Sequence, residues 1–476
     1  MIALTKRGVS RTALFVAGYL ALAALAFSDE IELGTGPKAQ SPREESAKAD
    51  ETGDVPAART LTVEEAVALA MESNMQLESA AIDLRMKERA RDNAWNVFIP
   101  SAQVSGTLAR QNKAANPYAA IFQSMGIPVS SPAEKDHWSM AAGLSLGLNI
   151  NAALVEGLRA TRQSYEAGKL SLDQARQETD RDVRKAFYGI LLQEESARLL
   201  REKLAAGEDR LKQTEINYRN GVVPELSVLQ AQLSVETQKP ALREAEITLE
   251  RQKALFAFII GLPPNTAITL VGKVAPAIRS YDGDELVKTR LADRLDVAIL
   301  SKNLELANTQ LRAARLQAYT PSVALGQSWL PMKAPIDADE WNDSQGAFTV
   351  TVAFDLVGLL PFSRTGQSLL DARESARKLE IALAQASYNA ELEIRDLVKR
   401  LDKARASIGT MELSVTIAQK AYRLSEQGYR AGTIEYLDLK DAETSLLQAE
   451  IGVLMEKYTY LSTLLDLETA VNARLD

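Results

Sequence analysis

Few side chains in this sequence are capable of covalent or metal chemistry. Its 476 residues include no cysteine and a single histidine, His137. The composition therefore excludes disulfides, thiolate nucleophiles and cysteine-ligated metals. A histidine metal site or a Ser-His-Asp triad would depend on His137 alone, beside Trp138 at the start of a predicted strand. Neither common glycine-rich phosphate loop is present. We therefore predict that the protein is not an enzyme and has no cofactor and no metal site.

A near-half-length repeat is the most informative pattern in the chain. The segment Tyr-Arg-Asn-Gly ending at Gly221 recurs 211 residues later as Tyr-Arg-Ala-Gly ending at Gly432. A Pro-Ser pair beginning at Pro100 has a counterpart beginning at Pro321. Charged residues make up 25% of the chain and aromatic residues only 6%, which favours long helices over a thick globular core. Such a duplication indicates two similar units that face one another or form a ring with further copies.

The first 26 residues are predicted to be an export signal. Lys6, Arg7 and Arg11 precede an apolar stretch, and small residues at 24–26 fit a cleavage site. A membrane anchor is the alternative, although the stretch of about 15 residues is shorter than the roughly 20 that a spanning helix needs. Residues 27–59, rich in Pro, Gly, Ser and charge, are predicted to be a disordered linker. Removing the signal changes the formal charge from −8 to −11, which argues against a nucleic-acid partner.

Four stretches alternate apolar with small or polar residues, which predicts four strands in two hairpins. They lie at about 98–110, 138–150, 321–330 and 347–357. A membrane-spanning strand needs about 9–11 residues with this alternation. An ordinary half-buried soluble sheet is the alternative. Aromatic residues near the strand ends favour the membrane, where they form girdles at the two interfaces. The predicted girdle residues are Trp138, Trp329 and Phe348.

Two very long helices are predicted after each pair of strands. Residues from Ile394 to Tyr422 place apolar side chains in alternating steps of three and four, and residues from Leu447 to Leu465 repeat the pattern. Gly221 and Gly432 are predicted to form the turns, because glycine tolerates the left-handed conformation that ends a helix. The predicted organisation is a first repeat at 60–265 with a helical hairpin at 152–261, a connector at 266–290, and a second repeat at 291–476 with a helical hairpin at 363–472.

Four strands cannot close a membrane barrel, because such barrels start near eight strands. Open sheet edges cannot face lipid, where each unpaired backbone group costs several kcal/mol. The chain is therefore expected to associate with copies of itself. Two, three or four copies would give 8, 12 or 16 strands, and the arithmetic alone does not choose among them.

These features together resemble the TolC-type outer-membrane factors, the exit ducts of drug-efflux and type I secretion systems. The resemblance covers about residues 60–472 and rests on the order and duplication of individually weak motifs. They are the opening segment Leu61–Ala70, the two Pro-Ser strand starts, the Gly-Leu-Pro-Pro stop at Gly261, and the two Tyr-Arg-x-Gly turns.

The resemblance implies a mainly α fold with a transmembrane β-barrel portion, assembled as a homotrimer with a 12-stranded barrel and a 12-helix periplasmic tunnel. It implies a passive exit channel in the outer membrane of a Gram-negative-type (diderm) bacterium, surrounded by outer-membrane lipid and gated at the periplasmic helix turns. The implied partners are a periplasmic adaptor protein and an inner-membrane pump of the RND, ABC or MFS type. The cargo is left open among drugs, proteins and metal ions.

The resemblance also implies roles for residues at the turns. Asp438 and Asp441 match the family's acidic pore gate, and three symmetry copies of each would attract cations and repel anions. Solvated acids near a helix N-terminus are the alternative for this pair. Ile434 departs from the family, which carries a basic residue there, so the family's closed-state latch is not expected. The turn residues implied to contact the adaptor are Gly221, Val222, Val223, Gly432, Thr433 and Ile434.

The main rival interpretation is an exported coiled-coil scaffold or adaptor with a soluble β-domain. Adaptors also contain helical hairpins, but they usually have one hairpin rather than two. The duplication and the strand alternation favour the channel.

Overall fold

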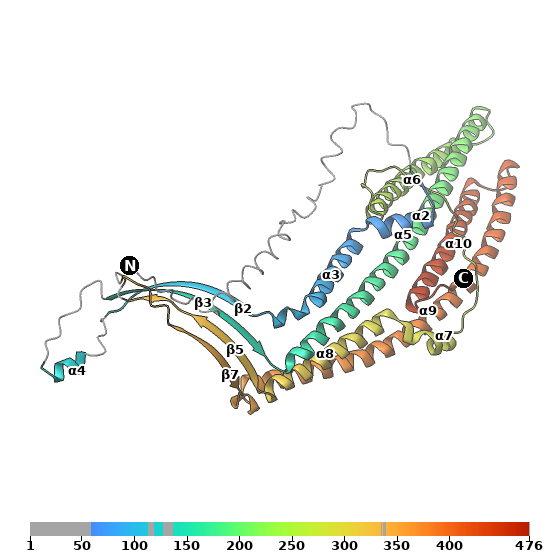
Figure 1. Ribbon diagram of the computed structural model, residues 1–476. Helices are drawn as coiled ribbons and strands as arrows, with labels where there is room; N and C mark the ends of the chain where they lie inside the picture. Colours follow the sequence, from blue (N-terminus) through green and yellow to red (C-terminus); the bar gives the residue numbers. More distant parts are fainter. Residues whose placement is uncertain (1–58, 113–118, 127–136, 335, 337–338, 476) are drawn as a thin grey trace. The chain divides into compact units, whose positions relative to one another are not determined.

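The computed structural model describes residues 59–112, 119–126, 137–334, 336 and 339–475 (Figure 1). The predicted signal at 1–26 and the predicted linker, apart from its last residue, lie outside these ranges. None of the described helices contains an 18-residue stretch apolar enough for a membrane span.

The first described elements are short. Strand β1 (Arg59–Leu61) pairs in parallel with β4 (Ile268–Leu270), so the start of the chain is tied to the connector. Helix α2 (Val63–Ser73) begins at the N-cap Thr62, whose side chain forms a capping box with Glu65. Helix α3 (Met75–Asp92) follows, and a 3₁₀ helix (Ala94–Phe98) leads to the sheet.

One antiparallel sheet holds all four long strands in the order β2-β3-β5-β7. The predicted strand at 98–110 begins at Ser101, because the 3₁₀ helix occupies the residues before Pro100. The strand predicted to reach residue 357 ends at Ala353, and a 3₁₀ helix follows at Val357–Leu359. The two predicted hairpins are present, and β3 joins β5 between them. The strands are β2 (Ser101–Arg110), β3 (Trp138–Ile150), β5 (Ser322–Trp329) and β7 (Gly346–Ala353), with a short β6 (Met332–Lys333) beside β3 and a short helix α4 (Ala119–Ser124) between β2 and β3.

The long helices repeat with the same offset as the sequence motifs. Helices α5 (Ala153–Arg219) and α6 (Glu225–Ile259) form the first hairpin, and α9 (Arg364–Arg430) and α10 (Tyr436–Ala470) form the second. All four boundaries of the second hairpin lie 211 residues after those of the first. Figure 1 shows α8 (Leu295–Tyr319) alongside α9, following α7 (Gly283–Arg290) of the connector. The mainly helical fold class with a strand portion agrees with the prediction.

Two hydrophobic cores occupy equivalent places in the two hairpins. In the first core, Val183, Phe187 and Ile190 of α5 pack with Phe256 and Ile260 at the end of α6. Adding 211 to each number gives members of the second core. These members are Ile394, Val398, Leu401, Leu467 and Val471. The duplication therefore extends from the surface motifs into the buried packing.

Candidate functional site

The register of the sheet gathers the apolar residues of all four strands on one face. Trp329 lies opposite Leu144, and Leu144 lies opposite Val104. Phe348 lies opposite Gln327, which is two residues before Trp329 in β5 and therefore on the same face of the sheet. Val104 and Phe348 are 82% and 67% exposed, Trp329 is 50% exposed, and Leu144 is half-buried. A broad apolar face is thus turned to the outside of the described chain.

The opposite face of the sheet carries no charged side chain in the described strands. In the four long strands its residues are Ser, Thr, Gln, Asn, Ala and Gly, and β6 adds Met332. Strands β2 and β7, at the two ends of the sheet order, each pair on one side within the described residues. The result is an open sheet with one apolar face, one uncharged polar face and two free edges.

The predicted girdle residues lie on the apolar face but at two levels. Trp329 pairs with Gly346 near the loop end of its hairpin, and Phe348 is two residues further along β7. Trp138 lies six residues before Leu144, the partner of Trp329. At about 3.4 Å per residue, this places Trp138 roughly 20 Å farther along β3. His137, just before Trp138, donates from Nδ1 to the carbonyl oxygen of Gln111 at 2.9 Å and continues the pairing of the hairpin.

A second group of exposed aromatic residues marks the helical end of the sheet, and sequence analysis missed it. These residues lie in the last turns before the Pro-Ser strand starts, just after β7, or just before α9. The two Pro-Ser pairs could have pointed to this group, because each pair marks where a helix ends and a strand begins. The group comprises Trp95 (58% exposed), Phe98, Tyr319, Phe354 and Phe362 (77% exposed).

Both predicted glycine turns have left-handed backbone. Gly221 has φ +71° and Gly432 has φ +73°. The amide of Val222 donates to the carbonyl of Asn217, and the amide of Thr433 donates to that of Gly428, each at 2.9 Å. These six-to-one bonds are Schellman caps, which satisfy the last carbonyls of α5 and α9. A Cβ at either glycine would meet nothing within 4 Å, so backbone conformation rather than crowding requires glycine there.

The tips of both turns are solvent-exposed. Val222 is 70% exposed, Thr433 is exposed, and Val223 and Ile434 are half-buried. Asp438 and Asp441 both lie exposed in the first two turns of α10. Three residues apart, they share one side of the helix. Among the described residues, neither carboxylate forms an ion pair.

A buried ion pair joins the two hairpins close to the turns, and sequence analysis missed it. Arg210 of α5 donates from Nη1 and Nη2 to the carboxylate of Glu443 on α10, at 3.1 and 2.9 Å. The two side chains are only 13% and 10% exposed. Burial lowers the pKa of Arg210, but the Glu443 hydrogen bonds outweigh this and the net pKa is raised. Both residues stand 11 positions from a glycine turn, but this spacing alone does not identify them as partners.

Further polar contacts extend the junction between the hairpins. Tyr422 of α9 accepts from Arg210 at 3.5 Å, and the hydroxyls of Thr214 and Tyr429 lie 3.4 Å apart. Lys203 of α5 donates to the hydroxyl of Thr444 at 3.3 Å. Burial lowers the pKa of Lys203, with the nearby Glu443 opposing the effect.

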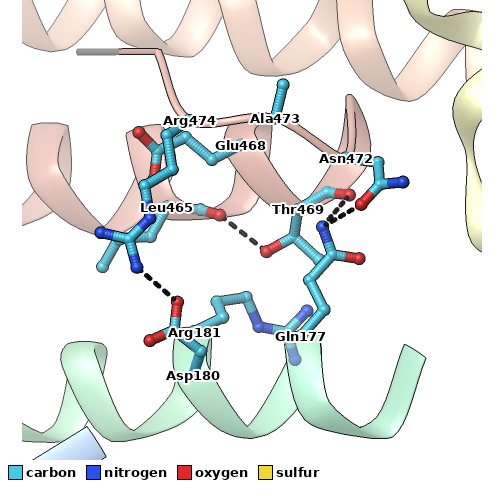
Figure 2. A pocket seen from close by; sticks show the side chains of 9 residues that line it. All are labelled: Gln177, Asp180, Arg181, Leu465, Glu468, Thr469, Asn472, Ala473 and Arg474. Atoms are coloured by element: carbon cyan, nitrogen blue, oxygen red, sulfur yellow. Dashed lines mark hydrogen bonds and ion pairs between the residues drawn. The ribbon is translucent and has the colours of Figure 1, made fainter. Parts of the chain in front are cut away.

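A pocket of about 210 Å³ lies farther from the turns, between α5 and the end of α10 (Figure 2). Gln177 donates to the carbonyl of Thr469 at 3.4 Å, and Arg474 pairs with Asp180 at 3.4 Å. The described residues contain no cluster of three or more side chains suited to hold a metal ion. The pocket residues come from α5, from the last turns of α10 and from the chain after α10. They are Gln177, Asp180, Arg181, Leu465, Glu468, Thr469, Asn472, Ala473 and Arg474.

Comparison with known proteins gives consistent matches along the chain. A family model described as outer membrane efflux protein matches residues 66–261 and 286–473. The cobalt-zinc-cadmium resistance protein CzcC of Cupriavidus metallidurans is 26% identical over 417 residues, covering 86% of this chain and 90% of CzcC. The outer membrane protein TolC of Vibrio cholerae is 22% identical over 310 residues, covering 61% of this chain and 66% of TolC.

Solved structures share the fold. The outer membrane protein VceC of Vibrio cholerae superimposes with a TM-score of 0.69 at 18% identity, over 87% of this chain and 97% of VceC. The CmeC outer membrane channel of Campylobacter jejuni gives a TM-score of 0.71 at 17% identity, over 86% of this chain and 85% of CmeC. At these identities the likeness concerns the fold.

Proposed function

The chain belongs to the outer membrane efflux protein family, and from this premise we propose that it is the outer-membrane exit channel of a tripartite efflux or type I secretion system. The family consists of outer-membrane channels rather than enzymes. The observation that carries the proposal is the four-stranded sheet with one exposed apolar face, one uncharged polar face and two free edges. Lipid can cover the apolar face, and the polar face then lines a water-filled passage.

The free edges of β2 and β7 require neighbouring strands in a membrane. Along the order β2-β3-β5-β7 every neighbour is antiparallel, so β2 and β7 also run in opposite directions. The β7 edge of one copy is thus able to pair antiparallel with the β2 edge of the next. Three copies close a 12-stranded barrel in this way, and their helical hairpins continue it as a 12-helix tunnel in the periplasm.

We place the periplasmic entrance at the turns around Gly221 and Gly432. The turn residues from Gly221 to Val223 and from Gly432 to Ile434, of which Val223 and Ile434 are half-buried and the rest exposed, are the surface offered to a periplasmic adaptor. Asp438 and Asp441, exposed and without ion-pair partners in the described chain, form acidic rings in the trimer and gate the passage. Trp138, Trp329 and Phe348 contribute to the girdle toward the outer surface.

The pump supplies energy and selects the cargo, because the sheet face that lines the passage has no charge with which to discriminate. The metal-resistance name of CzcC is therefore not transferred to this chain. The partners are a periplasmic adaptor and an inner-membrane pump of the RND, ABC or MFS type.

The mass of the protein extracted in detergent tests this function. Light scattering, with the detergent contribution subtracted, is expected to give three chains per particle. A monomeric particle would leave four strands unable to close, and would favour a coiled-coil scaffold with a soluble β-domain.

A further inference from the structure

The internal duplication makes it possible to infer a surface that the single chain leaves uncovered. Helix α5 corresponds to α9, and α6 corresponds to α10, with an offset of 211 residues. Within the chain, the two hairpins meet where α5, the first helix of one, contacts α10, the return helix of the other. Because α9 corresponds to α5 and α6 corresponds to α10, the equivalent contact joins α9 and α6. A ring of copies provides this contact, between α9 of one copy and α6 of the next.

The contact inside the chain, which we call the internal seam, contains several polar pairs. Lys185 of α5 pairs with Asp466 of α10 at 2.5 Å, and Arg181 lies 3.9 Å from the same carboxylate. Gln177 donates to the backbone of Thr469 at 3.4 Å. Together with Arg210–Glu443 and Lys203–Thr444, these contacts run along the length of the two helices. Charged and hydrogen-bonded side chains therefore recur along the internal seam.

Several of the equivalent positions on α6 and α9 carry large apolar side chains that are exposed. Gln177 corresponds to Tyr388 (70% exposed), and Thr469 corresponds to Phe258 (56% exposed). Arg181 corresponds to Leu392 (63% exposed), and Asp466 corresponds to Leu255 (57% exposed). At each of these four positions, the internal seam therefore has a polar side chain where α6 or α9 has a large apolar one.

Other positions along the same faces fit an uncharged contact. Thr444 corresponds to Leu233, which is 63% exposed, and Glu443 corresponds to the uncharged Gln232. Lys185 corresponds to Asp396, whose carboxylate already pairs with Arg400 of its own helix at 2.7 Å. No lone charge is thus offered to the neighbour at these points of the described chain.

We propose that α6 of one copy packs against α9 of the next through these residues, with Phe258 on Tyr388 and Leu255 on Leu392. This outer seam rests on the proposed ring of copies and adds the residues that hold it together. A second copy is the occupant, because the same copy that pairs with the free sheet edge continues along the helices beside it. Each contact joins two different faces, as a head-to-tail ring requires.

Cross-linking of cysteine pairs tests the outer seam, and the absence of native cysteine gives a clean background. The test variant is Leu255→Cys with Leu392→Cys in the full chain, treated in outer membranes with a short bismaleimide. The matched control is Asp466→Cys with Arg181→Cys, the same two positions in the other copy of the repeat. On denaturing gels, the test variant is expected to lose its monomer band to covalent dimers and trimers. The control is expected to stay at monomer mass, with its link inside one chain.

The detergent mass of the same samples separates the two proposals. Three chains per particle with no link between copies would overturn the outer seam and leave the channel standing. Monomeric particles would overturn both. A linked band at the mass of one chain plus a different protein would show that a partner, rather than a second copy, covers this face.

A second test of the outer seam uses charged substitutions and does not depend on the cysteine variants. Leu255→Asp alone is expected to reduce the trimer fraction, and adding Leu392→Arg to restore it, because the pair then reproduces Arg181 and Asp466. Equal loss of trimer in the single and double variants would contradict the proposed contact.

Discussion

The Arg210–Glu443 pair allows the sharpest test of how the two hairpins are held together near the turns. Arg210 precedes Gly221 by 11 residues, and Glu443 follows Gly432 by 11. At 1.5 Å per residue, the pair lies about 16 Å along the helices from the tips. Removing Arg210 leaves the buried Glu443 carboxylate without its bidentate partner, and only the charge of Lys203 remains nearby. The Arg210→Ala variant is therefore expected to weaken the contact of α5 with α10 at the proposed entrance.

The size of the effect follows from burial and geometry. The pair is bidentate, and its two side chains are 13% and 10% exposed. Charges about 4 Å apart attract by roughly 4 kcal/mol at an effective dielectric constant of 20. Breaking a buried pair by removing one partner costs about 3–5 kcal/mol. A loss of about 3 kcal/mol would favour separation of the helices by roughly 100-fold in each copy.

Single-channel conductance in planar bilayers measures the outcome. Arg210→Ala is expected to raise the resting conductance, because the hairpins part more readily. Lys212→Ala removes a neighbouring pair with Asp209, whose side chains are 73% and 79% exposed, and should change nothing measurable. Replacing both partners, as Arg210→Met with Glu443→Leu, should stay close to the parent, since apolar replacements of buried pairs are often neutral. Equal conductance for Arg210→Ala and Lys212→Ala would refute the reasoning.

Three further outcomes are expected. Asp438→Asn with Asp441→Asn should weaken block by divalent or trivalent cations at least tenfold, since a trimer loses six carboxylates and even about 0.25 kcal/mol from each, the attraction in water at about 16 Å, sums to about 1.5 kcal/mol; unchanged block, or equal weakening by Glu435→Gln, would remove the acidic-ring assignment. Gly432→Arg should abolish efflux with the protein still in the outer membrane, whereas Gly432→Ala should retain efflux at a backbone cost of about 1–2 kcal/mol; efflux by the arginine variant would count against this turn as an adaptor contact. Lys203→Met should raise the unfolding temperature, because burial lowers the folded-state pKa of Lys203. In the parent protein, the cost of burying the charged Lys203 falls as pH rises from its folded-state pKa to the unfolded value near 10.4. The stability advantage of Lys203→Met should therefore vanish above that pH. A difference in unfolding temperature that stays constant with pH would contradict this cause.

Local patterns in the sequence predict the elements well where one neighbour dominates the packing. Ile394, Leu397 and Leu401 follow the predicted spacing of α9, and all three are buried in its core. The cap of α2 is equally local, because the capping box of Thr62 involves only residues three apart. The turn glycines were predicted equally well, because a glycine that follows a long helix commonly ends that helix in the left-handed conformation.

Helix α10 shows where prediction from local sequence patterns fails. The predicted apolar seam from Leu447 to Leu465 is mostly half-buried, and only Leu465 is fully buried within it. The deepest residues are instead Tyr460 and Leu467, which face the core shared with α9. Tyr458, on the predicted seam, packs beside Gly189 of α5. The helix has two partners, so two apolar stripes overlap and the sequence alone does not assign them.

The Arg210–Glu443 contact could not be predicted for a related reason. The two residues are 233 positions apart, and charged residues are common throughout the long helices. Only the packing of α5 against α10 selects this arginine and this glutamate from the many on the surface. A repeat identifies equivalent positions, but it does not state which pairs of helices touch.

The different chemistry of the two seams has a physical reason in the duplicated fold. A contact inside one chain pays no entropy of association, so ion pairs that contribute little net free energy are sufficient to align it. A contact between copies must offset several kcal/mol of lost translational and rotational freedom. Burying exposed apolar surface supplies that free energy. Divergence of one ancestral interface would then place Arg181 and Asp466 inside the chain and Leu392 and Leu255 between copies. High salt should accordingly loosen the internal seam, where charges attract, before it separates the copies.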